Sequence, residues 1–337
     1  MHERYCVARH NTGSPPVLAF VAIIDPASKT IQQTQEHLQQ RIEALIHAYP
    51  LLSCSIETPH SRTPKFSSRG EVDVGAVLSP IEYREESIDV DEILTKELDG
   101  LSTASEVLEK APLWRVQIIT SASEEHHDAA TPFAVLLTIH HVLSDGRGSG
   151  RLLELLLGDG DIPSAPREEA TPPITSDALV KIPLTYALGM FYSEVLVPKL
   201  PSFLQSHFAQ PPSWPSSETQ LIQKSPLDTP KAFKTVLCPV GTIPALKALA
   251  RENGVKTVHP VLHSLCAVAA YAVSVHGRQT DEKGTRLHSS TPINLRSKAS
   301  EGEQTTCTGN FVGTVSRSLR RRPRWIYQRL TKTLSLR

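Results

Sequence analysis

The chain has 337 residues, a length that predicts about two domains. Its 35 Lys and Arg residues balance 35 Asp and Glu residues, so no net field draws it toward nucleic acid or an anionic membrane. No stretch reaches the roughly 18 apolar residues of a membrane span, and the 5 cysteines form no CxxC pair. We therefore expect a cytoplasmic protein with no nucleic-acid partner, no transmembrane segment and no metal site.

The first elements alternate between strand and helix. Val17–Asp25 is rich in β-branched residues and predicts a strand. Thr30–Tyr49 predicts an amphipathic helix, because apolar residues recur at intervals of three and four. After Pro50, Leu51–Ile56 is predicted to be a strand. A weaker helix is expected over 93–99.

Two apolar runs then predict neighbouring strands of one sheet. Pro112–Thr120 and Pro132–His141 are separated by a polar loop over 121–131. A glycine-rich turn follows, and Arg151–Leu157 predicts a helix. Two Pro-rich stretches, 158–176 and 210–230, then flank an apolar region, Leu179–Leu204, that predicts a short helical connection.

The second half is expected to begin near residue 231. Its predicted elements are a strand over 234–239, a helix over 242–253, a helix over 258–275 buried on most sides and a strand over 286–293. This order indicates an α/β (α+β layered) architecture. We assign 1–160 to a first subdomain, 161–230 to a crossover linker and 231–316 to a second subdomain. The acid-free, Arg-rich residues 317–337 predict a solvated basic tail.

The residues that could carry chemistry lie at the end of the strand Pro132–His141. His140 to Gly146 reads H-H-x-x-x-D-G, where an apolar strand runs into a turn. Imidazole suits general-base work, since its unperturbed pKa is about 6.5. Successive strand residues face opposite sides, so one histidine at most needs to face a crevice. For the same reason two adjacent histidines make a poor zinc site, and the plain alternative is a packed core histidine.

Several segments resemble one family, the CoA-dependent acyltransferase superfamily. HHVLSDG at His140–Gly146 is similar to its HHxxxDG signature. The opening Glu3–Arg9 resembles the fungal alcohol acetyltransferase branch most closely. The other matching segments, in the order expected for the family, are HAYPLLSCSI at His47–Ile56, PLWRV at Pro112–Val116, TPINLR at Thr291–Arg296 and GNFVG at Gly309–Gly313.

The resemblance implies two chloramphenicol acetyltransferase-like subdomains with a tunnel between them. His141 would be the general base, His140 a supporting residue, and Asp145 a structural residue paired with Arg296. Gly146 would leave room for a close backbone approach. Arg296, Gly309 and Asn310 are expected to line the substrate site. No tightly bound cofactor is implied; the partners are acyl-CoA, as co-substrate, and a small alcohol or other hydroxyl-bearing acceptor.

The sequence after Gly313 departs from the family pattern. It resembles no part of the family's second half, so we expect that subdomain to be incomplete through C-terminal truncation. The leading hypothesis is an acyl-CoA:alcohol O-acyltransferase. The alternatives are a condensation-type acyltransferase that takes a carrier-bound acyl group, and a catalytically inactive truncated remnant.

Overall fold

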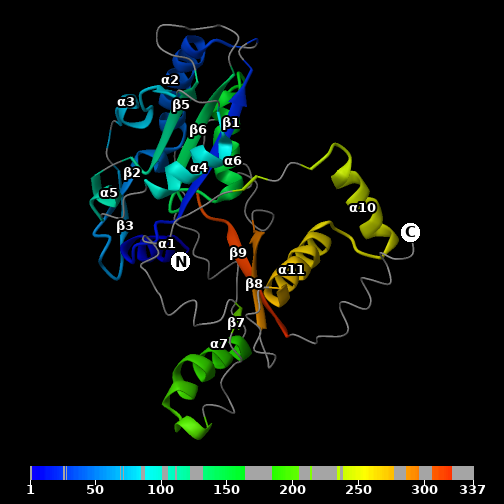
Figure 1. Cartoon of the computed structure of the whole chain (residues 1–337). Helices are drawn as coiled ribbons and strands as arrows, with labels where there is room; N and C mark the ends of the chain where they lie inside the picture. Colours follow the sequence, from blue (N-terminus) through cyan, green and yellow to red (C-terminus); the bar gives the residue numbers. More distant parts are fainter. Residues whose placement is uncertain are drawn as a thin grey trace. The chain divides into compact units, whose positions relative to one another are not determined.

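The computed structural model describes most of the first half of the chain and parts of the second (Figure 1). The described residues are 2–25, 27, 29–68, 70, 72–84, 88–100, 105–110, 112–121, 132–163, 184–204, 213–214, 234–235, 238–276, 286–295 and 306–320. They fall into two compact units. The first comprises Met1–Lys181, Lys224–Thr235 and Pro292–Gly313, and the second Ile182–Gln223, Val236–Thr291 and Thr314–Arg337.

A four-stranded sheet organises the first unit. Its spatial order is β1-β6-β5-β4, with bounds β1 (Val17–Ile24), β4 (Glu82–Tyr83), β5 (Trp114–Thr120) and β6 (Phe133–His140). Strand β6 is antiparallel to both of its neighbours, and every one of its residues is buried. The predicted adjacency of the two strands on either side of the polar loop is therefore confirmed.

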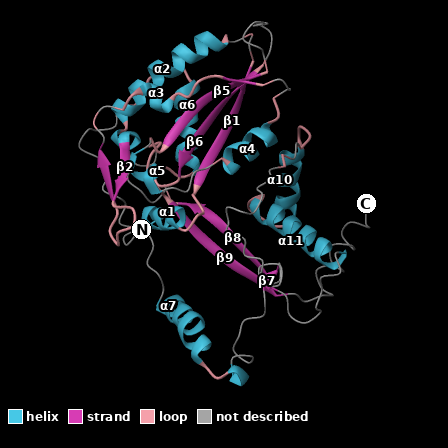
Figure 2. Ribbon diagram, turned by 60° about the vertical axis from the view of Figure 1, so that its left-hand side comes forward, coloured by secondary structure: helices cyan, strands magenta, loops and turns pink. Residues whose placement is uncertain are grey.

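Helices cover both faces of this sheet (Figure 2). On one face, α2 (Ile31–Ala48) and α6 (Gly146–Leu157) pack with inward residues of β5 and β6 in the main hydrophobic core. On the other face, Ile93 of α4 (Val90–Asp99) packs against Ile119, Ala134 and Leu136. The predicted start of α2 is also confirmed, because Thr30 and Gln33 form a capping box there. Burial on two faces explains why β6 is almost continuously apolar.

The remaining elements of the first unit are short. They are α1 (His2–Asn11), η1 (Pro50–Ser53), β2 (Cys54–Glu57), β3 (Lys65–Ser68), α3 (Val74–Val77) and α5 (Ser105–Lys110). The strand predicted over Leu51–Ile56 is wrong in its first half, where Pro50 begins a turn of 3-10 helix. Proline at the first helical position favours such a turn, and only Cys54–Glu57 pairs as a strand, with β3.

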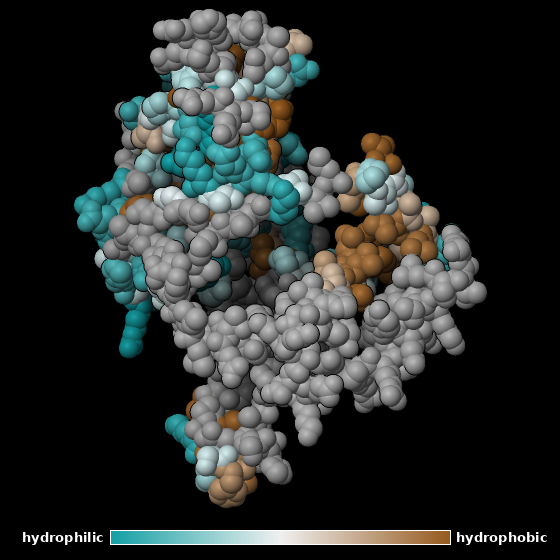
Figure 3. Space-filling view, in the orientation of Figure 1, coloured by the Kyte–Doolittle hydropathy of each residue, from teal (hydrophilic) through white to brown (hydrophobic). Residues whose placement is uncertain are grey.

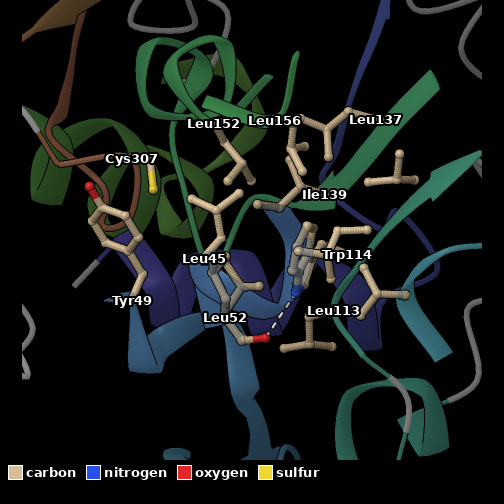
Figure 4. Packing of buried hydrophobic residues seen from close by; sticks show 14 of the residues in the cluster. Leu45, Tyr49, Leu52, Leu113, Trp114, Leu137, Ile139, Leu152, Leu156 and Cys307 are labelled. Carbon is tan, nitrogen blue, oxygen red and sulfur yellow. Dashed lines mark hydrogen bonds between the residues drawn. The ribbon is translucent and has the colours of Figure 1, made fainter. Parts of the chain in front are cut away.

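The core beside this turn joins α2, η1 and β5 (Figure 4). Trp114 is 2% exposed, and its indole Nε1 donates a 2.9 Å hydrogen bond to the carbonyl of Leu52. The large apolar ring is thus buried while its one polar atom is satisfied.

The second unit contains helices and a three-stranded sheet of order β7-β8-β9. Its elements are α7 (Leu184–Phe191), η2 (Tyr192–Leu196), η3 (Val197–Lys199), β7 (Ser213–Trp214), α10 (Thr242–Glu252), α11 (His259–His276), β8 (Arg286–Asn294) and β9 (Val312–Arg320), the last residues of β8 and the first of β9 belonging to the first unit. The predicted helices over 242–253 and 258–275 are confirmed. Strand β9 includes the first residues of the predicted basic tail, and 321–337 lie outside the described residues.

Two predictions for this half are wrong. The described residues of 234–239 form no strand; Thr235 instead donates its backbone N–H to the Asp91 carboxylate at 2.8 Å. Over 259–269, where its side chains are described, helix α11 is not buried on most sides, since Leu262 and Leu265 are 42% and 51% exposed. Figure 3 shows apolar side chains at the surface of the α10 and α11 region. An apolar sequence predicts a helix here but does not fix what covers it.

Among the described helices, none combines the length and the apolar composition needed to cross a membrane. Among all residues that the structure describes, no group of three or more His, Cys, Asp and Glu side chains could hold a metal ion.

We predict that Leu137→Ala destabilises the first unit by about 2–5 kcal/mol, because it leaves a cavity in the main core. Leu137 is fully buried in β6. The control is Ile23→Ala in neighbouring β1, where the side chain is 51% exposed and the cost should be below about 1 kcal/mol. Urea unfolding followed by circular dichroism measures both values; equal losses would contradict this account of the core.

Candidate active site

The paired histidines lie at the end of the central strand and are held by both neighbouring segments. The backbone N–H of His140 donates to the carbonyl of Leu113 at 2.7 Å. The next N–H, that of His141, donates to the carbonyl of Pro16, also at 2.7 Å. The signature therefore leaves the sheet from a backbone that is fixed on both sides.

Residues 141–145 form the turn of the HHxxxDG signature, the signature turn. A segment distant in sequence, 306–311, is hydrogen-bonded to this turn. Gly309 donates its N–H to the carbonyl of Leu143 at 2.7 Å, and its own carbonyl accepts from the N–H of Asp145 at 3.3 Å. These contacts form a short parallel β-bridge between Ser144 and Gly309. The Ser144 hydroxyl also donates to the carbonyl of Cys307 at 2.7 Å. The turn is thus joined to this segment by backbone hydrogen bonds and by the Ser144 hydroxyl.

Asp145 connects the turn, helix α6 and segment 306–311. It is 1% exposed, and its Oδ1 accepts a 2.8 Å hydrogen bond from the N–H of Gly148, which caps α6. Its Oδ2 accepts from the N–H of Phe311 at 2.9 Å. The cap explains why α6 begins at Gly146 rather than at the predicted Arg151. The predicted partner, Arg296, lies outside the described residues.

The glycine that the geometry demands is Gly309 rather than Gly146. Gly309 has φ +85°, and a Cβ there would lie 3.0 Å from a ring carbon of Phe311. A Cβ at Gly146 would meet no heavy atom within 4 Å. The close approach predicted at Gly146 is therefore not found, whereas a side chain at 309 would strain the bridge.

The imidazole of His141 is bonded to the amide of Asn310. His141 Nδ1 lies 2.8 Å from Asn310 Oδ1. The amide nitrogen of Asn310 donates back to the carbonyl of His141 at 2.7 Å. In the described residues, Asn310 thus contacts the signature turn; the substrate contacts expected for it and for Gly309 stay predictions.

His140 is in a different environment. It is 5% exposed, and its Nδ1 accepts from the N–H of Val142 at 3.2 Å. Its neutral ring therefore carries its proton on Nε2, which has no hydrogen-bond partner within the described part of the chain. Burial, together with repulsion from His10 and His141, lowers the pKa of His140 to about 3. With its lone pair occupied, His140 is poorly suited to act as a base.

Sequence reasoning missed several neighbours of the site. The ring centroids of His10 in α1 and of His140 are 5.3 Å apart, although no sequence motif includes His10. Cys307 was also missed; it lies beside Tyr49 in Figure 4. Burial is the larger cause, and this thiol the next, of a rise in the pKa of Tyr49 to about 12. In the sequence, the only indication of a place near the site was that His10 follows the Glu3–Arg9 motif and that Cys307 shortly precedes the GNFVG motif.

We predict that Asp145→Ala loses more stability than Asp89→Ala. Asp89 is an exposed N-cap that accepts from Asp91 in α4, so its loss should cost about 0.5–2 kcal/mol. Asp145→Ala removes an equivalent cap and also breaks the buried hydrogen bond from the N–H of Phe311, which adds about 1–3 kcal/mol. Urea unfolding of both variants tests this; an equal or smaller loss for Asp145→Ala would mean that the second bond contributes nothing.

The buried His140 predicts a pH dependence of stability. In the unfolded chain imidazole titrates near pH 6.5, whereas in the folded chain the pKa of His140 is lowered to about 3. As the pH falls below about 6.5, the unfolded state binds this proton first, so stability declines toward pH 3 and is fully retained above 6.5. His140→Gln should flatten this decline between pH 7 and 4.5, measured by urea unfolding. Parallel curves for parent and variant would contradict it.

Comparison with known proteins identifies the fold. No protein-family model and no curated protein matches the chain. Trichothecene 15-O-acetyltransferase from Fusarium sporotrichioides is similar with a TM-score of 0.56 at 12% identity, over 94% of this chain and 64% of that one. The cyclization-docking bidomain of EpoB from Sorangium cellulosum gives 0.56 at 16%, over 98% and 61%. The first condensation domain of the CDA synthetase gives 0.50 at 14%, over 99% and 71%.

The chain spans 60% to 71% of the lengths of the similar structures. Similarity at such low identity establishes architecture. It confirms the fold-level resemblance inferred from the motifs, because a condensation domain and an acetyltransferase are both among the similar structures. This chain has the chloramphenicol acetyltransferase-like fold of the condensation domains and CoA-dependent acyltransferases.

Proposed function

We propose that this chain transfers an acyl group from a thioester to a hydroxyl group, with His141 as the general base. The observation that carries this proposal is the bonding of the His141 ring. Its Nδ1 faces the side-chain amide oxygen of Asn310, Oδ1, which can only accept, so Nδ1 holds the proton and the lone pair of the neutral ring is on Nε2. A base needs such a lone pair in a fixed direction.

The proposed reaction is a single displacement. Nε2 of His141 removes the proton of the acceptor hydroxyl as its oxygen attacks the thioester carbonyl. The tetrahedral intermediate then collapses, the carbon–sulfur bond breaks, and the leaving thiolate takes the proton back from Nε2. The products are an ester and a free thiol, and His141 returns to its neutral state. Because no acyl-enzyme forms, the rate depends on holding both substrates together.

For the substrates we propose acyl-CoA as donor and a small alcohol as acceptor. The acetyltransferase among the similar structures and the alcohol acetyltransferase-like motifs support this choice. All 5 cysteines carry free thiols, which supports the cytoplasmic location that we propose with it.

A second candidate is condensation-type transfer from a carrier-bound acyl group. The observation that favours it is the similarity, at comparable TM-score, to the EpoB bidomain and to the CDA synthetase condensation domain. Both reactions would use the same base, so the donor distinguishes them. Thiol release should be measured with a panel of acyl-CoA thioesters and, separately, with acyl groups on a phosphopantetheinylated carrier protein.

We predict that His141→Ala lowers turnover by about 10²- to 10⁴-fold, the usual contribution of a general base. His140→Ala should have a milder effect on the chemical step, because the lone pair of Nδ1 is occupied by the N–H of Val142. The control is His47→Ala, an exposed histidine at the end of α2. Thiol release with acyl-CoA and simple alcohols measures turnover, and circular dichroism checks folding.

Near-normal turnover in folded His141→Ala would overturn the mechanism. Turnover only with the carrier-bound donor would replace the first candidate with the second. No turnover of the parent chain with either donor would identify it as the inactive remnant.

A further inference from the structure

Asn310 bonds the His141 side chain at one end and the signature backbone at the other. We propose that Asn310 is a positioning residue that selects the tautomer of His141, holding its proton on Nδ1 and its lone pair on Nε2. This inference rests on the proposed function for its catalytic meaning, whereas the tautomer itself can be measured independently.

The orientation of the Asn310 amide follows from its partners. Its nitrogen donates to the carbonyl of His141 at 2.7 Å and to that of Val142 at 3.3 Å. Both oxygens can only accept, so the NH₂ group must face them. A flipped amide would place its oxygen against two carbonyl oxygens and lose both hydrogen bonds. The amide oxygen is thereby directed at the imidazole.

This orientation decides where the proton of His141 lies. Asn310 Oδ1 is an acceptor, and it lies 2.8 Å from Nδ1. Nδ1 must therefore donate, which leaves Nε2 unprotonated in the neutral ring. An imidazole without this partner would divide between two tautomers, of which only one presents Nε2 as a base. The neighbouring His140, bonded through Nδ1 to an N–H, is held in the opposite tautomer.

The protein places Asn310 without help from a substrate. Its side chain is 7% exposed, and its two neighbours both bond the signature turn. Gly309 donates to the carbonyl of Leu143 at 2.7 Å, and Phe311 donates to Asp145 Oδ2 at 2.9 Å. Both protons of the Asn310 amide are used within the protein. The amide is thus built to orient the imidazole.

The primary test is the tautomer of His141 in the full chain, read by two-bond ¹H–¹⁵N correlation spectra of ¹⁵N-histidine-labelled protein. The signals of His141 among the 14 histidines are assigned by their absence in His141→Gln. We expect a protonated Nδ1 and an unprotonated Nε2 in the neutral ring. A parent spectrum with the proton on Nε2 would overturn the proposal without any Asn310 variant.

Variants of Asn310 test its cause. Asn310→Ala should move the His141 signals toward a mixture of tautomers and lower kcat more than it raises KM, by less than the loss in His141→Ala. Asn310→Asp keeps an acceptor for Nδ1 and should keep its proton there, but its second carboxylate oxygen would face the carbonyls of His141 and Val142, so this variant should also be less stable than the parent. The control is Thr308→Ala, whose hydroxyl is paired with Thr306 in the same segment; its His141 spectrum should match the parent.

An Asn310→Ala spectrum identical to the parent's would show that another group sets the tautomer, and would overturn the inference. The expected spectra in a chain without acyl-transfer activity would instead uphold the role of Asn310 and refute the proposed function.

Discussion

The candidate site depends on one buried carboxylate that accepts from two backbone N–H groups far apart in sequence. Asp145 bonds Gly148 at the start of α6 and Phe311 in the segment 306–311. Both N–H groups would lose this buried acceptor without it, and the loss of a buried hydrogen bond is costly. The carboxylate therefore connects the signature turn both to helix α6 and to the distant segment 306–311.

That connection has a consequence for chemistry, because it brings Asn310 to the ring of His141. Asn310 lies between Gly309, whose N–H donates to the carbonyl of Leu143, and Phe311, whose N–H donates to the Asp145 carboxylate. The histidine that the sheet end presents is thereby bonded through an amide rather than left to rotate. Asp145 thus holds the segment that carries Asn310, and Asn310, the proposed positioning residue, bonds the imidazole of His141.

The two adjacent histidines show how backbone context separates identical side chains. His140 faces the core, accepts from an N–H and stays neutral because burial disfavours its charged form. His141 faces an acceptor instead and presents the opposite nitrogen. The strand ends at His140 and the turn begins at His141, so the pair divides into a packed residue and a candidate base.

Local patterns determined much of the first unit. The apolar runs of β1, β5 and β6, the periodicity of α2 and the HHxxxDG turn are all properties of contiguous residues, and each was predictable from them. Patterning predicted less well where burial depends on distant partners, as in the exposed face of α11, or where one residue sets a local start, as Pro50 and Asp145 do.

The sequence by itself thus determined which residues could do chemistry, because a histidine pair before D-G at a strand end is a local signal. Only the tertiary structure decided how they are held. The bonds of Asp145 to Phe311 and of His141 to Asn310 join positions that no periodicity relates, since hydrogen bonds across 166 and 169 residues exist only once the chain has folded. The resemblance already pointed to His141 rather than His140, whereas the different hydrogen-bond partners of the two rings are a property of the folded backbone.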